Sequence, residues 1–269
     1  MIRMATVWER TVDVLRGRAA ILAGIAFVTL FLPSVLGAAV TIAVGDAAAA
    51  PAARSLVGLV SAALMLFGML AITAVASDPR VDRAAAYRRA AERLPAAIGV
   101  ALVLVIALSL TFLPGTLALI AAGATVTAAG VVMQGAAPGP LALAGGLLLV
   151  AAALLLWLGA RLAPLFAVVV NERLGLGAIR RAFALTRGAA ARLIGVLILY
   201  AILVMVLSVA VRSVIGVVLR LLLDSDGAVF LGTSVALAVV SAGATVVQNA
   251  FYAQYYAAAR EREEAAPLA

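Results

Sequence analysis

Six long stretches of this chain are almost free of charged residues, and they restrict the fold more than any other feature. They lie at roughly 19–43, 56–76, 95–118, 141–171, 193–220 and 229–258. A run of about 18 or more apolar residues is long enough to cross a bilayer as a helix. A membrane β-barrel would instead alternate apolar and polar residues in short segments. The sequence therefore predicts an all-α, polytopic membrane protein with six transmembrane helices.

The composition agrees with a membrane-embedded chain and argues against several chemistries. The 269 residues are 66% hydrophobic and 12% charged, with a mean hydropathy of +1.21, whereas soluble domains are about 25% charged. Cysteine and histidine are absent, which removes thiolate nucleophiles, disulfides, the commonest general base and the commonest zinc ligand. The chain also has no P-loop, GxSxG or HExxH motif. We therefore expect no enzyme activity, no cofactor and no bound metal.

The distribution of arginine predicts how the spans are oriented. All 20 basic residues are arginine, and the net charge is +8. Most lie before the first span, after the second and fourth spans, and in the tail, whereas Arg54 and Arg220 lie in loops of the other face. Basic loops stay in the cytoplasm and face anionic phospholipid. Arginine beside abundant alanine and glycine is typical of GC-rich bacteria. We expect a multi-pass protein of the bacterial inner (cytoplasmic) membrane with both termini cytoplasmic and no nucleic-acid partner.

The stretch between residues 116 and 134 is uncharged and nearly long enough to form a further span. The arginine-rich segments 80–93 and 173–192, which flank it, are both expected on the cytoplasmic side. The number of crossings between them must therefore be even. We expect residues 119–139 to form an outer-face loop, an interfacial helix or a re-entrant segment.

An internal repeat is visible in the arginine-rich segments. Aligning Glu9–Ile25 with Arg180–Val196 pairs Arg10 with Arg181, Arg16 with Arg187, Gly17 with Gly188 and Gly24 with Gly195. A third copy, Arg83–Val100, keeps the pattern and Gly99. We predict three parallel repeats of an amphipathic cytoplasmic helix plus a transmembrane hairpin, at about 1–77, 78–171 and 172–259. They would form a single domain, 1–264, followed by a short cytoplasmic tail, 265–269.

The basic helices are amphipathic at a period of about 3.6 residues. Leu176, Ile179 and Phe183 share one face in the third copy, beside a stripe of arginines. Such helices lie in the membrane interface and direct arginine toward phosphate. The candidate headgroup-contacting residues are Arg10, Arg16, Arg88, Arg89, Arg173, Arg180, Arg181 and Arg187. The alternative is that these helices only orient the spans and pack beneath them.

Arg161 is the most informative single residue because it interrupts an apolar run. It lies eleven positions before Glu172, which is about 16 Å at 1.5 Å per residue and close to the middle of a bilayer core about 30 Å thick. A charge at that depth needs a partner inside the bundle. Pro164 has no N–H and is expected to kink the helix beside it.

The sixth span offers neutral partners at nearly the same depth. We predict a polar cluster of Arg161 with Gln248, Asn249 and Tyr252, together with Tyr200 of the fifth span. One interpretation is that this cluster locks the fourth span to the sixth. The other is that it forms a site for an anion or a lipid headgroup.

The sequence around Arg161 resembles a family signature. Residues 161–188 read RLAPLFAVVVNERLGLGAIRRAFALTRG, which is similar to the signature of the glycerophosphodiester phosphodiesterase membrane-domain family. That family has an Arg and a Pro in the fourth span and a Glu at its exit, matched here by Arg161, Pro164 and Glu172. Leu185–Gly188 fit its leucine-threonine-x-glycine pattern, and Tyr255–Glu264 resemble its closing span. Ala182 departs from the family's usual serine.

The resemblance implies the membrane domain alone, because this chain has no histidine to supply the catalytic residues of the hydrolase barrel that some members carry. The favoured hypothesis is therefore a non-enzymatic membrane protein that associates with anionic phospholipid through its basic helices and the Arg161 cluster. One alternative is a small transporter or channel for an anionic or amphipathic solute. The other is an accessory subunit whose cytoplasmic face binds a protein partner.

Overall fold

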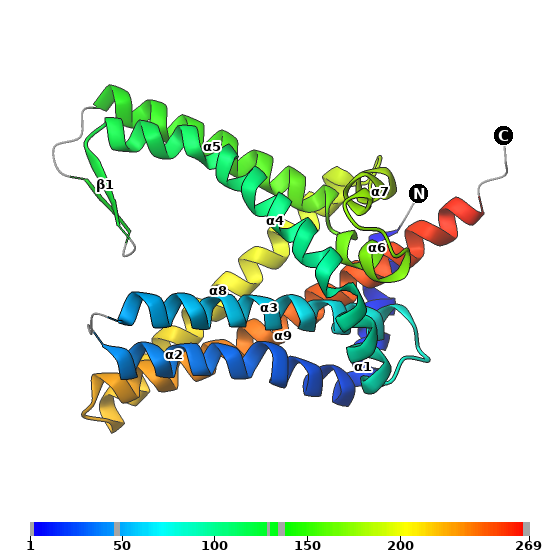
Figure 1. The fold of residues 1–269 in the computed structure, drawn as a ribbon, viewed down its shortest axis with the longest axis horizontal. Helices are drawn as coiled ribbons and strands as arrows, with labels where there is room; N and C mark the ends of the chain where they lie inside the picture. Colours follow the sequence, from blue (N-terminus) through cyan, green and yellow to red (C-terminus); the bar gives the residue numbers. More distant parts are fainter. Residues whose placement is uncertain (1–2, 46–48, 128–129, 134–137, 266–269) are drawn as a thin grey trace.

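The structure is a computed structural model, and it describes residues 3–45, 49–127, 130–133 and 138–265. Its elements are α1 (Met4–Ala26), η1 (Phe27–Phe31), α2 (Leu32–Val44), α3 (Ala50–Ser77), α4 (Arg83–Ala121), β1 (Ala124–Thr127), β2 (Gly130–Met133), α5 (Pro138–Arg161), α6 (Leu165–Asn171), α7 (Gly177–Leu185), α8 (Ala190–Leu222) and α9 (Asp226–Glu264) (Figure 1). Six helical segments are long and apolar enough to cross a membrane. The prediction of a helical chain is confirmed, and the described residues include six helices that could span a membrane.

The first crossing is helical throughout, but its backbone departs from regular α-helical geometry at two places. At Arg18 the backbone leaves the helical region, with φ −128° and ψ 18°, which separates the amphipathic start of α1 from its apolar part. At η1 the helix widens into a π-turn, where the N–H of Leu32 donates to the carbonyl of Phe27. Pro33 follows directly. Because proline has no N–H and crowds the preceding turn, a wide turn accommodates it.

The arginine-rich segments gather at one end of the molecule. The start of α1, the α3–α4 link, α6, α7 and the end of α9 lie together on the right of Figure 1. We call this the arginine-rich end. Which side of a membrane it faces stays a prediction.

The packed core lies between α1, α3 and α9, and it extends to α6, α7 and the first turns of α4. Leu22, Ile25, Leu70, Ile72 and Tyr255 are among its largest fully buried side chains. By contrast, α8 buries only Leu193 among its 33 residues. The α4–α5 pair diverges from the α2–α3 pair toward the opposite end (Figure 1). The core therefore occupies the arginine-rich half of the molecule.

The threefold repeat is only partly visible. The amphipathic segment is set off by the bend at Arg18 in the first copy, and it is the separate helix α7 in the third copy. In the second copy, α4 continues through Pro95 without a break in the helix. The aligned glycines also differ, because Gly24 packs against the guanidinium of Arg83 whereas Gly99 and Gly195 have open space beside them. The repeat stays a prediction.

The region expected to hold an outer-face loop, an interfacial helix or a re-entrant segment contains a short hairpin instead of a helix. β1 and β2 pair antiparallel, with Ala124 opposite Met133 and Thr127 opposite Gly130. The hairpin lies at the opposite end from the arginine-rich end (Figure 1). Apart from this short hairpin, the elements of the described residues are helical, as predicted. Residues 128–129 and 134–137, and most of the tail predicted at 265–269, lie outside the described residues.

Candidate functional site

Arg161 lies where the fourth crossing breaks into two helices. α5 ends at Arg161, and α6 begins at Leu165 after a turn that contains the buried Pro164. The break frees backbone carbonyls that a continuous helix would use. The hydroxyl of Thr186, at the end of α7, lies within hydrogen-bonding distance of the carbonyl of Arg161, at 3.2 Å, and of the carbonyl of Ala182 in its own helix, at 2.9 Å. The predicted kink is thus a joint to which α7 is attached.

The side chain of Arg161 is held by aromatic rings. Its guanidinium carbon lies 5.0 Å from the ring centre of Phe183 and 5.8 Å from that of Trp157. The two rings contact each other edge to face, with centroids 5.7 Å apart. Contacts of a guanidinium with ring faces at these distances are attractive. The Nε atom of Arg161 is buried and has no hydrogen-bond partner among the described residues.

The cluster predicted around Arg161 does not form in the described chain. Asn249 donates to the carbonyl of Thr245 within its own helix at 2.8 Å, and the Nε2 atom of Gln248 donates to the hydroxyl of Tyr252 at 2.7 Å. Tyr200 donates to the carbonyl of Ala244. Equal depth does not fix the direction of a side chain around its helix. Arg161 is two positions, or about 200° of rotation, from the face of α5 that approaches these residues.

Tyr200, Gln248 and Tyr252 nevertheless lie together in a cavity of about 680 Å³ between α5, α8 and α9. Ser241 and Thr245 of α9 also line it, and its α5 wall contains Leu156 and Gly159. We call this the α5–α8–α9 cavity. All its lining residues are uncharged, and Arg161 is not one of them. The structure thus separates the charged residue from the neutral polar residues that were expected to hold it.

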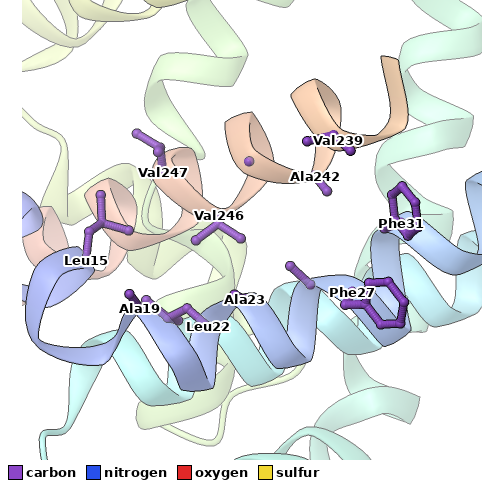
Figure 2. A pocket seen from close by; sticks show the side chains of 12 residues that line it. Leu15, Ala19, Leu22, Ala23, Phe27, Phe31, Val239, Ala242, Val246 and Val247 are labelled. Carbon is purple, nitrogen blue, oxygen red and sulfur yellow. The ribbon is translucent and has the colours of Figure 1, made fainter. Parts of the chain in front are cut away.

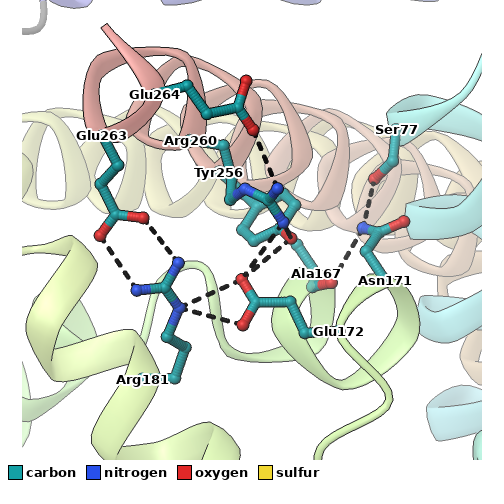
Figure 3. Close-up of polar contacts among 9 residues, drawn as sticks. All are labelled: Ser77, Ala167, Asn171, Glu172, Arg181, Tyr256, Arg260, Glu263 and Glu264. Atoms are coloured by element: carbon teal, nitrogen blue, oxygen red, sulfur yellow. Dashed lines mark hydrogen bonds and ion pairs between the residues drawn. The ribbon is translucent and has the colours of Figure 1, made fainter. Parts of the chain in front are cut away.

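A network of ion pairs at the arginine-rich end is centred on Glu172 (Figure 3). Its carboxylate lies 3.0 Å from Nε of Arg181 and 3.8 Å from Arg260, and it accepts a hydrogen bond from the hydroxyl of Tyr256 at 3.1 Å. Arg181 also pairs with Glu263 at 2.6 Å. These carboxylates raise the pKa of Arg181 above its ordinary value, chiefly through the hydrogen bond with Glu263.

The Glu172 network joins α6 and α7 to the end of α9. One position before Glu172, Asn171 donates to the hydroxyl of Ser77 at the end of α3, at 3.1 Å. Sequence reasoning treated Glu172 only as a marker of the cytoplasmic exit. The available signal is that Glu172 is a lone carboxylate directly before Arg173 and eight positions before Arg180. Its 15% exposed side chain indicates a structural joint.

The eight arginines predicted to contact headgroups fall into two groups. Three form ion pairs inside the protein: Arg10 with Glu261 at 2.8 Å, Arg89 with Asp78 at 3.4 Å, and Arg181 in the Glu172 network. The other five are exposed, and their side chains make no ion pair or hydrogen bond within the described ranges; they are Arg16, Arg88, Arg173, Arg180 and Arg187. We call these five the free arginines.

Arg18 has a role that sequence reasoning missed. Its guanidinium donates to the backbone carbonyls of Val75, Asp78 and Pro79 at 2.9, 3.0 and 2.6 Å. The last carbonyls of a helix have no partner within the helix and carry its negative dipole end. Arg18 therefore caps the end of α3. Nothing in the sequence distinguished it from the neighbouring arginines.

A second cavity is a groove of about 570 Å³ between α1, η1 and α9, and its lining side chains are apolar (Figure 2). Its walls are Leu15, Ala19, Leu22, Ala23, Ala26, Phe27, Phe31, Val239, Ala242, Gly243, Val246 and Val247. Leu15 lies at one end and Phe31 at the other (Figure 2). Leu15 directly precedes the free arginine Arg16. We call this the α1–α9 groove.

The site was also compared with the geometry of metal sites and with known proteins. Within the described residues, no group of three or more His, Cys, Asp and Glu side chains is placed to hold a metal ion. No family model matches the sequence, and no curated protein or solved structure matches it either. The interpretation of this chain therefore depends on the geometry of its own residues.

Proposed function

We propose that this chain is a non-enzymatic protein of the bacterial inner membrane that binds anionic phospholipid at its arginine-rich end. The observation that carries the proposal is the set of five free arginines. Nearby carboxylates pair with Arg10, Arg89, Arg181 and Arg260, which leaves the free arginines available. Each arginine close to an anionic membrane surface contributes about 1 kcal/mol of attraction. We place this end on the cytoplasmic side.

The α1–α9 groove supports the proposal because it offers a place for an acyl chain. Its lining side chains are all apolar, so the groove would hold a lipid tail without leaving a polar side chain unpaired. Arg16 follows Leu15 at one end of the groove. A phospholipid with its phosphate near Arg16 and a tail in the groove would pair the charge of the arginine and cover the apolar surface of the groove.

The resemblance to the glycerophosphodiester phosphodiesterase membrane-domain family is part of the proposal. Arg161, Pro164 and Glu172, which carry the resemblance, lie at the joint between α5, α6 and α7. In this chain they hold helices together, which favours a structural role for the motif. The role agrees with a membrane domain that has no chemistry of its own.

The test compares equal losses of charge at the two ends. Replacing Arg173, Arg180 and Arg187 with glutamine removes three charges from the arginine-rich end, whereas Arg54, Arg212 and Arg220→Gln removes three from the opposite end. Native mass spectrometry would count phosphatidylglycerol retained through purification from mixed phosphatidylglycerol and phosphatidylethanolamine membranes. We expect the first variant to retain several-fold less phosphatidylglycerol, and the second to resemble the wild type. Equal retention by all three proteins would contradict the proposal.

A further inference from the structure

The α5–α8–α9 cavity has hydrogen-bonding groups that the protein does not use. The Oε1 atom of Gln248, the hydroxyl hydrogen of Tyr252 and the hydroxyl of Ser241 have no partner in the part of the chain that the structure describes. In the interior of a bilayer there is little water to compensate such groups, so leaving them unpaired is costly. A ligand that both donates and accepts hydrogen bonds would satisfy them.

The kind of side chain that lines the cavity restricts that ligand further. No cationic or anionic side chain lines the cavity. Arg161 lies on the far side of α5 from the cavity, and its guanidinium contacts Trp157 and Phe183. An ion buried in such a site without a counter-ion would pay a large desolvation cost. The head of the ligand must therefore be polar but uncharged.

The remaining walls indicate the rest of the ligand. They are apolar, with Leu155, Leu197 and Val204 among them, except for Tyr200 and Thr245, whose hydroxyls bond to backbone carbonyls of α9. The volume of about 680 Å³ lies in the range of about 300–1,000 Å³ that is usual for small-molecule sites. Met205, on the α8 wall, is 67% exposed, so an apolar tail can leave the cavity along α8 and enter the surrounding lipid.

We propose that the α5–α8–α9 cavity binds the head of an uncharged lipid-like amphiphile, whose hydroxyl and carbonyl groups bond to Gln248, Tyr252 and Ser241. Diacylglycerol, with one free hydroxyl and two esters, has this chemistry and serves as the probe. The site and the ligand are distinct from the free arginines and the anionic phospholipid of the proposed function. Either proposal can therefore fail while the other stands.

The first experiment blocks the cavity without touching its polar groups. Gly159 lines the cavity, and a Cβ atom added at this position meets no other atom within 4 Å, so Gly159→Leu is expected to fill part of the space. Gly146→Leu is the matched control, because Gly146 is on the same helix, is equally free of neighbours and lies outside the cavity. A photoactivatable diacylglycerol in nanodiscs would label each protein, and mass spectrometry would locate the labelled peptides.

We expect saturable labelling of α5 and α8 in the wild type and in Gly146→Leu. In Gly159→Leu, labelling should fall at least fivefold. Excess unlabelled diacylglycerol should compete with the probe, whereas phosphatidylglycerol should not. Equal labelling of Gly159→Leu and Gly146→Leu, or equal competition by the anionic lipid, would overturn the proposal.

The second experiment removes hydrogen bonds while keeping the shape of the cavity. Tyr252→Phe combined with Gln248→Leu should weaken diacylglycerol binding by about threefold to tenfold for each bond lost. Tyr87→Phe is the control, since Tyr87 packs against Phe67 away from the cavity. If the double variant and the control bind the probe equally, the polar groups do not recognise the ligand. A thermal unfolding curve for each variant separates lost binding from lost folding.

Discussion

The two halves of this molecule are built from the same residue types and yet are packed differently. Around α1, α3 and α9, nine residues of α3 alone are buried, including the consecutive run Leu70–Ala76. Across α8, only Leu193 is buried, and Leu203 and Met205 are more than 60% exposed. We call these the packed half and the lipid-facing half. The difference teaches that apolar composition places a helix in the membrane, whereas close approach and polar bonds decide which helices pack together.

The particular contacts of the packed half explain the difference. Gly68 of α3 lies directly against Thr29 of η1, Arg18 caps α3, and Gln254 of α9 donates to the carbonyl of Ala76 at 2.6 Å. Without water, helices in a bilayer associate through small residues and polar bonds of this kind. The lipid-facing half has fewer such bonds, of which Tyr200 to Ala244 is one.

The largest expected effect comes from overfilling the packed half. A Cβ atom on Gly68 would lie 2.7 Å from the Cβ of Thr29 and closer still to its hydroxyl, so Gly68→Val should destabilise the fold by about 1–3 kcal/mol. Gly58→Val is the control, because Gly58 is on the same helix with no neighbour within 4 Å. Thermal unfolding in detergent measures both. Equal melting temperatures would mean that α3 and η1 are not in close contact.

Removing the cap of α3 should have the next largest effect. Arg18→Ala deletes three hydrogen bonds from a cation to backbone carbonyls, and we expect a loss of about 2 kcal/mol. Arg16→Ala, two positions away and exposed, should change stability by less than about 0.5 kcal/mol. Chemical unfolding in mixed micelles would give both values. A cost for Arg16→Ala as large as that for Arg18→Ala would show that charge, not capping, is responsible.

A smaller effect is expected from the Glu172 network. Glu172→Gln keeps the size of the side chain but removes the charge that attracts Arg181 and Arg260, so stability should fall by about 1 kcal/mol. Because this network attaches α7 to α9, hydrogen exchange should rise in Gly177–Leu185 more than in α3. Uniform exchange changes across the protein would argue against a local joint.

The smallest effect is a dependence on pH. The backbone N–H of Arg80, with help from Arg89, holds the pKa of Asp78 below its ordinary value. The carboxylate therefore stabilises the fold above its unfolded pKa of about 3.9, and this contribution is lost as the pH falls through the lower folded pKa. Melting temperatures of wild type and Asp78→Asn between neutral pH and pH values below about 4 should converge at the acid end. Parallel curves would contradict this role of Asp78.

The sequence predicts the fold better than the site, for a physical reason. Length and hydropathy fix six crossings, and the missing N–H of Pro164 predicts the break beside Arg161. Depth along a span also follows from residue number, so the sequence predicts Gln248 and Tyr252 near Arg161. Their direction around the helix depends on how α5, α7 and α9 pack. That packing sends Arg161 to Phe183 and leaves Gln248 to the cavity.

The sequence also does not predict which individual arginines are bonded within the protein. Net charge and clustering identify the arginine-rich end, but they do not distinguish Arg16 from Arg18. One is exposed and the other caps α3. Likewise, Arg180 and Arg181 are adjacent, yet only Arg181 pairs with Glu172 and Glu263. Which arginine is free for a lipid depends on carboxylates that lie up to 251 positions away in the chain, as Glu261 does from Arg10.

The proposed function requires the arginine-rich end to face the anionic, cytoplasmic surface of a membrane. Because the chain has no cysteine, single cysteines introduced as Gly175→Cys at that end and Asp224→Cys at the other, both exposed, can be labelled without background. A membrane-impermeant maleimide applied to intact bacterial cells should label Asp224→Cys at once and Gly175→Cys only after permeabilisation. The reverse pattern would place the free arginines on the wrong side and contradict the account.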